Sequence, residues 1–96
     1  DLIVTGAENV WPDEVEAAIS TMPGVREVAV VGRPDPRWGQ RVTAVVVAAD
    51  PSHPPTLDQV RDHVRARLPA HAAPRELVVT EALPRTALGK VRRAAL

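Results

Sequence analysis

The residues best suited to chemistry lie near the C-terminus, in the stretch PRTALGKVRR at positions 84–93. This stretch contains Lys90, the only lysine of the chain, while the other eleven basic side chains are arginine. An ammonium group is a compact point charge on a flexible stem, whereas a guanidinium is a wide planar fork. Lys90 therefore suits a site where a single positive charge must reach a charged oxygen in a crowded place. A surface lysine that begins a terminal helix is the alternative that these residues leave open.

The residues before Lys90 predict an exposed loop. Gly89 has no Cβ, so the backbone there can turn tightly or approach a ligand closely. Thr86 begins this loop, and residues 91–96 are expected to start a final helix.

Trp38 is a second residue whose type and position suggest a specific role. It lies in a proline-containing loop, residues 33–40, and the only other aromatic residue of the chain is Trp11. A tryptophan in such a loop serves either as a lid over the core or as a stacking surface for a ligand. The residues alone favour the lid.

The other polar residues fit structural roles. His53, His63 and His71 have neither metal-ligand spacing nor a neighbouring cluster of cysteines or carboxylates, so we expect no metal site. Asp13 and Glu14 lie at the expected start of a helix, where carboxylates complement the positive end of the helix dipole. We interpret them as dipole-stabilising residues and not as an acid–base pair.

Composition restricts the classes of function. Ninety-six residues provide one small domain, with a core built mainly from Ala, Val and Leu. The lack of cysteine excludes disulfides, thiol nucleophiles and thiolate metal sites, and we expect a cytoplasmic protein. No apolar run is long enough to span a bilayer.

The charge is unevenly distributed although the net charge is zero. Residues 1–50 carry four basic and eight acidic side chains, and residues 51–96 carry eight basic and four acidic ones. This is a modest bias toward an anionic ligand in the second half. The basic residues are not interleaved with aromatic residues that could stack on bases, so a nucleic acid partner is not expected.

Hydrophobic patterning predicts an α+β fold. Residues 1–10 should form a short hairpin that turns at Gly6. Helices are expected over residues 12–22 and 56–68, the second introduced by a capping box from Thr56 to Gln59. Strands are expected over residues 25–32, 41–49 and 75–80. We therefore predict a small antiparallel sheet of about three main strands, plus the N-terminal hairpin, packed with helices.

The pattern P-x-T-x-x-G-K-x-x-R resembles the last signature of the adenylate-forming enzymes, which include acyl-CoA synthetases, luciferases and the adenylation domains of peptide synthetases. Three further segments match the family in the same order: GAENVWP at 6–12, DPRWG at 35–39 and LPAHAAP at 68–74. The resemblance thus covers the whole chain. It implies that residues 1–96 are the C-terminal lid domain of a longer AMP-forming acid–CoA ligase. The strand-like start without an initiator Met favours the same interpretation.

The resemblance implies a role for each matched residue. Lys90 would bind the carboxylate substrate and the ATP phosphate oxygens during adenylation, in a catalytic loop that includes Thr86 and Gly89. The positions implied to face CoA are Gly6, Ala7, Glu8 and Asn9 beside the pantetheine, Trp38 and Gly39 packed on CoA, and Arg75 near its nucleotide end.

The sequence departs from the family at three positions. Ala7 replaces the more usual second glycine of the first loop, which would be strained if that position required a positive φ. His71 replaces an aromatic residue, and Ala72 stands where synthetases often have lysine. Arg75 could compensate for the missing basic group.

The resemblance also implies partners and cofactors outside this chain. A large N-terminal adenylation domain would bind ATP, Mg²⁺ and the acid, and the lid would rotate about a hinge at Asp1 or the residue before it. The whole protein would convert a carboxylic acid, ATP and CoA into acyl-CoA, AMP and pyrophosphate. The 96-residue chain alone is expected to be inactive and to bind none of these molecules tightly.

Two other functions stay open. Within the family, the chain could belong to an adenylation domain or a ligase that loads a carrier protein. From a different class, it could be a non-catalytic binding module on a generic α+β fold. A Ser/Thr/Gly-rich phosphate loop upstream would support the ligase.

Overall fold

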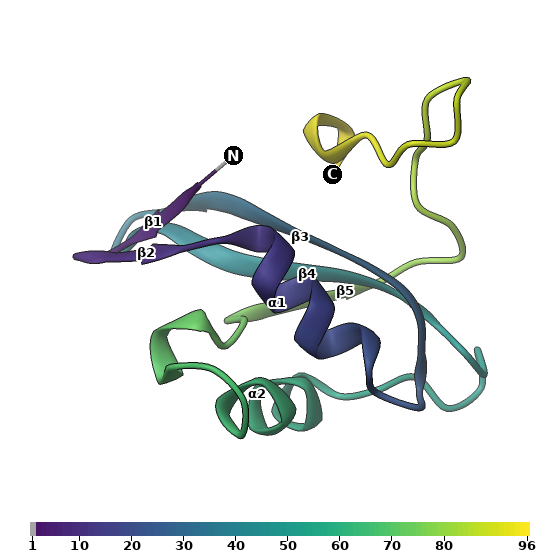
Figure 1. Ribbon diagram of the computed structural model, residues 1–96, viewed down its shortest axis with the longest axis horizontal. Helices are drawn as coiled ribbons and strands as arrows, with labels where there is room; N and C mark the ends of the chain where they lie inside the picture. Colours follow the sequence, from purple (N-terminus) through teal and green to yellow (C-terminus); the bar gives the residue numbers. More distant parts are fainter. Residues whose placement is uncertain (1) are drawn as a thin grey trace.

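The centre of the fold is a sheet in the strand order β3-β4-β5, shown in Figure 1. The computed structural model describes residues 2–96, so the hinge residue expected at Asp1 lies outside the described part. The main elements are β1 (Ile3–Thr5), β2 (Glu8–Val10), α1 (Pro12–Ser20), β3 (Val25–Asp35), β4 (Gly39–Ala48), α2 (Leu57–Arg65) and β5 (Glu76–Val79). Two short 3₁₀ helices, η1 (Ala70–Ala72) and η2 (Arg93–Ala95), complete the chain.

Strand β4 is buried on both faces of the sheet. Its alternate residues Val42, Ala44 and Val46 belong to one core cluster, which also contains buried residues of α1 and α2. Val45 and Val47, which lie on the opposite face because side chains alternate along a strand, belong to a second cluster with Leu83. The two helices therefore cover one face, and the segment that follows β5 covers the other.

Helix α2 begins as its capping box predicts. The backbone N–H of Gln59 donates to Thr56 Oγ1 at 3.1 Å, and the Thr56 N–H donates to Gln59 Oε1 at 2.9 Å. These reciprocal bonds satisfy donors that a helix N-terminus leaves without partners. Val60 and Val64 then lie fully buried against the sheet.

The α+β fold class is confirmed, with a three-stranded sheet and an N-terminal hairpin. One detail differs, because the sheet is mixed. β3 and β4 pair antiparallel, whereas β5 runs parallel to β4 in a register that places Glu76 opposite Thr43. The reason is the connection, since α2 and η1 carry the chain back across the face of the sheet, as a parallel crossover requires.

Two boundaries also differ from the sequence-based prediction. The hairpin of β3 and β4 extends further, so that only residues 36–38 lie outside the strands. At the C-terminus, the expected helix over residues 91–96 is reduced to η2. Val91 is held in an extended bridge to Arg85, so helical geometry begins only at Arg93.

Because β4 is buried on both faces, we expect two Val→Ala substitutions in the sheet to lower the free energy of unfolding by different amounts. Val46 is 0% exposed and Val79 is 45% exposed. We expect Val46→Ala to lower the free energy of unfolding by about 1.5–3 kcal/mol, because it removes buried methyl groups and leaves a cavity. The matched control Val79→Ala should cost less than about 1 kcal/mol. Urea unfolding of the two variants measures the difference, and equal costs would contradict the assigned core.

Candidate functional site

Lys90 is presented by a tight hairpin, here called the Lys90 hairpin (residues 84–92). The Thr86 N–H donates to the Lys90 carbonyl at 2.7 Å, and the Gly89 N–H donates to the Thr86 carbonyl at 2.9 Å. The Thr86 hydroxyl also accepts from the Lys90 N–H at 3.2 Å. Gly89 has a φ of +87°, a left-handed conformation that favours glycine. Thr86 and Gly89 therefore fix the backbone on which Lys90 stands.

The Lys90 side chain lies on the exposed part of the hairpin. Lys90 is exposed, and Leu88 near the tip of the hairpin is 97% exposed. No carboxylate of residues 2–96 forms an ion pair with the Lys90 ammonium. The ammonium is thus available to an anionic group outside the described chain.

Two predicted residues, Gly6 and Arg75, lie against Trp38, and Arg37, which the sequence did not single out, joins them. The Gly6 N–H donates to the Trp38 carbonyl at 2.8 Å. The guanidinium carbon of Arg75 lies 4.2 Å from the centroid of the Trp38 ring, and that of Arg37 lies 5.2 Å from it. We call Gly6, Arg37, Trp38 and Arg75 the Trp38 cluster. It combines an aromatic surface with two cationic groups.

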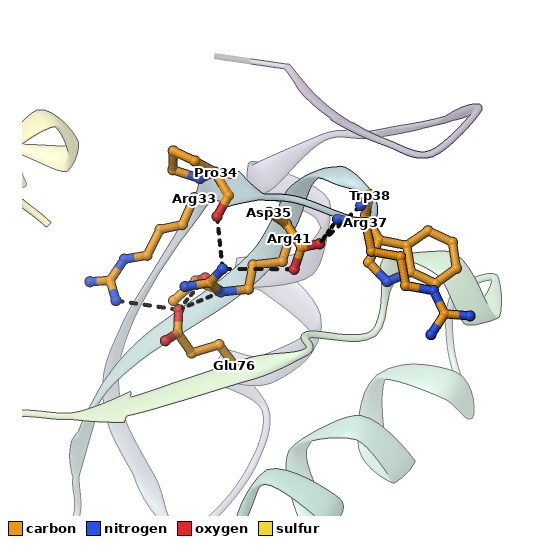
Figure 2. Close-up of polar contacts among 8 residues, drawn as sticks. Arg33, Pro34, Asp35, Arg37, Trp38, Arg41 and Glu76 are labelled. Carbon is orange, nitrogen blue, oxygen red and sulfur yellow. Dashed lines mark hydrogen bonds and ion pairs between the residues drawn. The ribbon is translucent and has the colours of Figure 1, made fainter.

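The loop that carries Trp38 is held by Asp35. Its Oδ1 accepts from the backbone N–H groups of Arg37 at 2.8 Å and Trp38 at 2.9 Å, as Figure 2 shows. These backbone hydrogen bonds lower the pKa of the Asp35 carboxyl. Gly39 closes the loop with a φ of +79°, a left-handed conformation that favours glycine. Trp38 is half-buried and belongs to neither core cluster of residues 2–96, and its ring packs against Gly6 and Arg75.

The turn between β1 and β2 explains why Ala7 is tolerated. Gly6 has a φ of +60°, while no non-glycine residue of 2–96 has a positive φ. A positive φ at only the first central residue is the pattern of a type II′ turn, which requires glycine there. Ala7 therefore carries no backbone strain. A Cβ on Gly6 would lie 3.3 Å from Cε3 of Trp38, so Gly6 also permits close packing against the ring.

The neighbouring predicted residues lie beside the Trp38 cluster. Glu8 is exposed, and its carboxylate lies 3.9 Å from Nδ1 of His71, which η1 brings next to β2. Asn9 is exposed on β2 opposite Val4. Arg75 is placed by its backbone, whose N–H donates to the Val42 carbonyl at 2.9 Å.

The structure thus brings the residues expected to face CoA together and keeps Lys90 apart from them. In Figure 1 the β1–β2 hairpin lies at the left end of the sheet, and the yellow-green Lys90 hairpin extends at the upper right. The two groups of predicted residues occupy opposite ends of the domain.

Sequence reasoning missed the network around Glu76 (Figure 2). Glu76 Oε1 accepts from Arg41 Nε at 3.1 Å, from Arg33 Nη1 at 3.3 Å and from Thr43 Oγ1 at 2.9 Å. Desolvation alone would raise the pKa of the Glu76 carboxyl, but the hydrogen bonds from Arg41 and Thr43 outweigh it and lower the pKa. Arg41 also donates to the Pro34 carbonyl at 2.7 Å and so supports the start of the Trp38 loop. The β4–β5 register that creates this network was not visible in the sequence.

Asp13 and Glu14 lie in the first turn of α1, as the dipole interpretation expects, and Asp13 and Glu16 have a further partner that the sequence did not indicate. Arg93 donates to Glu16 Oε1 at 2.6 Å and to Asp13 Oδ1 at 2.9 Å. The hydrogen bond with Glu16 raises the pKa of Arg93. Glu16 Oε2 also accepts from the Val30 N–H at 2.7 Å. These contacts attach the C-terminal segment to α1 and β3.

Two further findings concern residues 2–96. These residues include no group of three or more His, Cys, Asp or Glu side chains placed to hold a metal ion. None of the helices there is long and apolar enough to cross a membrane.

Comparison with known proteins gives consistent matches. A family model described as "AMP-binding enzyme C-terminal domain" matches residues 14–90. A probable 2-succinylbenzoate–CoA ligase of Mycobacterium tuberculosis is 52% identical over 96 residues, which are all of this chain and 25% of that protein. A 4-chlorobenzoate–CoA ligase of an Arthrobacter species is 50% identical over the same length, which is 18% of that protein. The chain therefore spans a quarter or less of the length of these curated relatives.

Solved structures share the fold. A malonyl-CoA ligase in a ternary product complex with methylmalonyl-CoA and AMP is 46% identical, with a TM-score of 0.84, over 88% of this chain and 18% of that one. A Mycobacterium tuberculosis fatty acyl CoA synthetase is 38% identical, with a TM-score of 0.90, over 99% of this chain and 18% of that one. Both identities are high enough for the likeness to extend beyond the fold.

The Glu76 network predicts a pH-dependent contribution to stability. The folded-state pKa of Glu76 lies below its ordinary value of 4.5, so its contribution is present above that value and is lost as the pH falls through the lowered pKa. We expect Glu76→Gln to lower the free energy of unfolding by about 1–2 kcal/mol at pH 7, with the difference shrinking toward zero in acid. Urea unfolding of both proteins at neutral and acidic pH measures this.

The matched control is Glu81→Gln, because Glu81 is exposed and makes no ion pair among residues 2–96. Its cost should be within about 0.5 kcal/mol at either pH. A Glu76→Gln cost that stays constant with pH would show that the carboxylate charge is not what stabilises the network.

Proposed function

The chain belongs to the AMP-binding enzyme C-terminal domain family, and from this membership we propose that it is the C-terminal lid domain of an AMP-forming acid–CoA ligase. In the proposed reaction, a carboxylate oxygen attacks the α-phosphorus of ATP, and the bond to pyrophosphate breaks. The thiol sulfur of CoA then attacks the acyl carbon, loses its proton, and displaces AMP. The observation that carries the proposal is the exposed ammonium of Lys90 on a hydrogen-bonded hairpin.

Lys90 would act in the first half-reaction. Negative charge builds on the phosphoryl oxygens and the leaving group, so a fixed cation there stabilises the transition state more than the ground state. The Lys90 hairpin satisfies the requirement for fixed placement, since the Thr86 side chain and the left-handed Gly89 set its backbone. Mg²⁺ would add further charge neutralisation, but residues 2–96 have no cluster to hold it.

The Trp38 cluster would act in the second half-reaction. CoA contains an adenine ring and phosphate groups, which match a tryptophan ring with two guanidinium groups placed over it. The turn at Gly6 brings the β1–β2 hairpin against Trp38 and so completes this surface. Because Lys90 lies at the other end of the domain, use of both surfaces requires the domain to rotate against the rest of the protein. The proposed hinge is Asp1 or the residue before it.

The names of the relatives concern two open questions, which are the acyl acceptor and the carboxylic acid substrate of the whole protein. The relatives named as CoA ligases support CoA over a carrier protein as acceptor. Their names include aromatic acids at 50–52% identity and long-chain fatty acids at 38% identity, all over the full chain. Since domains this similar occur in ligases for such different acids, we expect the selecting pocket to lie outside residues 1–96.

We expect Lys90→Ala in the whole protein to lower the rate of acid-dependent adenylation by about 10²–10³-fold, because one preorganised charge at the transition state is removed. Pyrophosphate exchange measures this step. Lys90→Arg should restore little of the rate, because the guanidinium is wider and planar.

The control for this prediction is Arg92→Ala. Arg92 is exposed, and its positive charge lies two residues after Lys90 in the sequence. It should leave adenylation within about 2-fold, since an exposed charge is screened. Adenylation at the full rate in the Lys90→Ala protein would remove the main support for the proposal.

The isolated 96-residue chain is expected to form no acyl-adenylate. Lys90 is the only catalytic group that we propose for it, and residues 2–96 include no cluster that could hold a metal ion. Incubation with ATP and a panel of carboxylic acids, followed by chromatography for adenylates, measures this. Turnover by the isolated chain would show that the proposed division between two domains is wrong.

A further inference from the structure

The hydrogen bonds that shape the Lys90 hairpin do not by themselves orient it. The bonds between residues 84–92, including Arg92 N–H to the Pro84 carbonyl at 2.8 Å, are all internal to the hairpin. They make it rigid but do not attach it to the sheet. A lysine that must reach one oxygen needs the whole hairpin to hold one direction.

Arg85 supplies a direct link between the hairpin and the sheet. Its Nη1 donates to the carbonyl of Gly89, the residue directly before Lys90, at 2.9 Å. Its Nη2 forms an ion pair with Glu27 Oε1 on β3. One guanidinium therefore connects the peptide group that precedes Lys90 to a strand of the central sheet.

The environment of Glu27 favours this link. Its side chain is only 26% exposed, so the pair is less screened than one on the open surface. Arg26 also approaches Glu27, but at 3.8 Å and with a side chain that is 67% exposed, and within residues 2–96 it forms no side-chain hydrogen bond or ion pair with the hairpin. Arg85 is thus the arginine that joins Glu27 to the hairpin.

A second link fixes the chain on the other side of Lys90. Arg93 binds Glu16 and Asp13 on α1, and Val91 packs against the core cluster formed by Leu83 and residues of β3 and β4. In the sequence, Lys90 therefore lies between Arg85, which pairs with a glutamate of β3, and Arg93, which pairs with a glutamate of α1. Of the two arginines, Arg85 is the one whose side chain donates a hydrogen bond to a backbone carbonyl of the hairpin.

We propose that Arg85, paired with Glu27, is a positioning residue for Lys90, an inference that rests on the proposed function of Lys90. Arg85 acts through the Gly89 carbonyl and does not itself touch the substrate. A guanidinium suits this role because its fork can donate to two acceptors at once, whereas an ammonium is a single point charge.

The test measures both half-reactions in the whole protein. Misplacement of a reacting group by about 1 Å can cost about 10²-fold in rate, so we expect Arg85→Ala to lower kcat for adenylation by about 10–100-fold. The KM for the acid and the rate of thioester formation from a pre-made acyl-adenylate should each stay within about 2-fold. Arg85→Lys should recover only part of the rate, and Glu27→Gln should lose less than Arg85→Ala because the Gly89 contact remains.

Arg26→Ala is the matched control, because it removes an arginine beside the same carboxylate without touching the hairpin. It should leave adenylation unchanged. Thermal unfolding of each variant checks that the protein is folded. If Arg85→Ala does not fold, the Glu27→Gln and Arg85→Lys proteins carry the test, and wild-type adenylation in both would overturn the proposal.

A double variant separates positioning from other roles. If Arg85 acts through Lys90, adding Arg85→Ala to Lys90→Ala should cause no further loss of adenylation. A further loss of about 10-fold or more would mean that Arg85 acts independently, and the inference would fail while the proposed function stands. Full adenylation by Lys90→Ala alone would instead overturn the proposed function.

Discussion

Strand β4 is buried on both faces, and the elements on each side of the sheet pack against it. Its side chains alternate between the cluster shared with α1 and α2 and the cluster shared with Leu83 and the C-terminal segment. Without the second cluster, residues 83–96 would have little apolar surface to pack against. The same strand thus stabilises the domain and provides the platform for the Lys90 hairpin. β3 and β4 also extend to residues 35 and 39, where they present the Trp38 loop.

Arginine–carboxylate pairs perform most of the polar positioning in this protein. Glu76 links Arg33 and Arg41 beneath the Trp38 loop, Glu27 receives Arg85, and Glu16 receives Arg93. The single lysine differs from these arginines, because each of these guanidinium groups forms an ion pair within the domain. Lys90 is exposed, and its ammonium is not paired with any described carboxylate. In the proposed function, positioning and chemistry are thus divided between the two basic residue types.

The sequence predicted the fold class and the α2 capping box, because these depend on local patterns, whereas the residues of both candidate surfaces came from the family resemblance and stay predictions. Trp38, Gly6 and Lys90 stand in short motifs whose backbone requirements can be read directly. The parallel pairing of β5 and the Glu76 network could not be predicted in the same way, since both depend on the strand register across the crossover. The partners of Arg85 and Arg93 are 58 and 77 residues away in sequence, so only the folded structure identifies them.

In the proposed function, the two ends of one domain serve two half-reactions. The most direct measurement is the rate of thioester formation from a pre-made acyl-adenylate in the whole protein carrying Trp38→Ala, beside its rate of adenylation. Loss of a stacking surface for adenine should slow thioester formation by about 10-fold or more at limiting CoA, with adenylation unchanged. Trp11→Ala, which removes the other, 57% exposed tryptophan, is the control. Equal loss of both half-reactions in the Trp38→Ala protein would contradict the account.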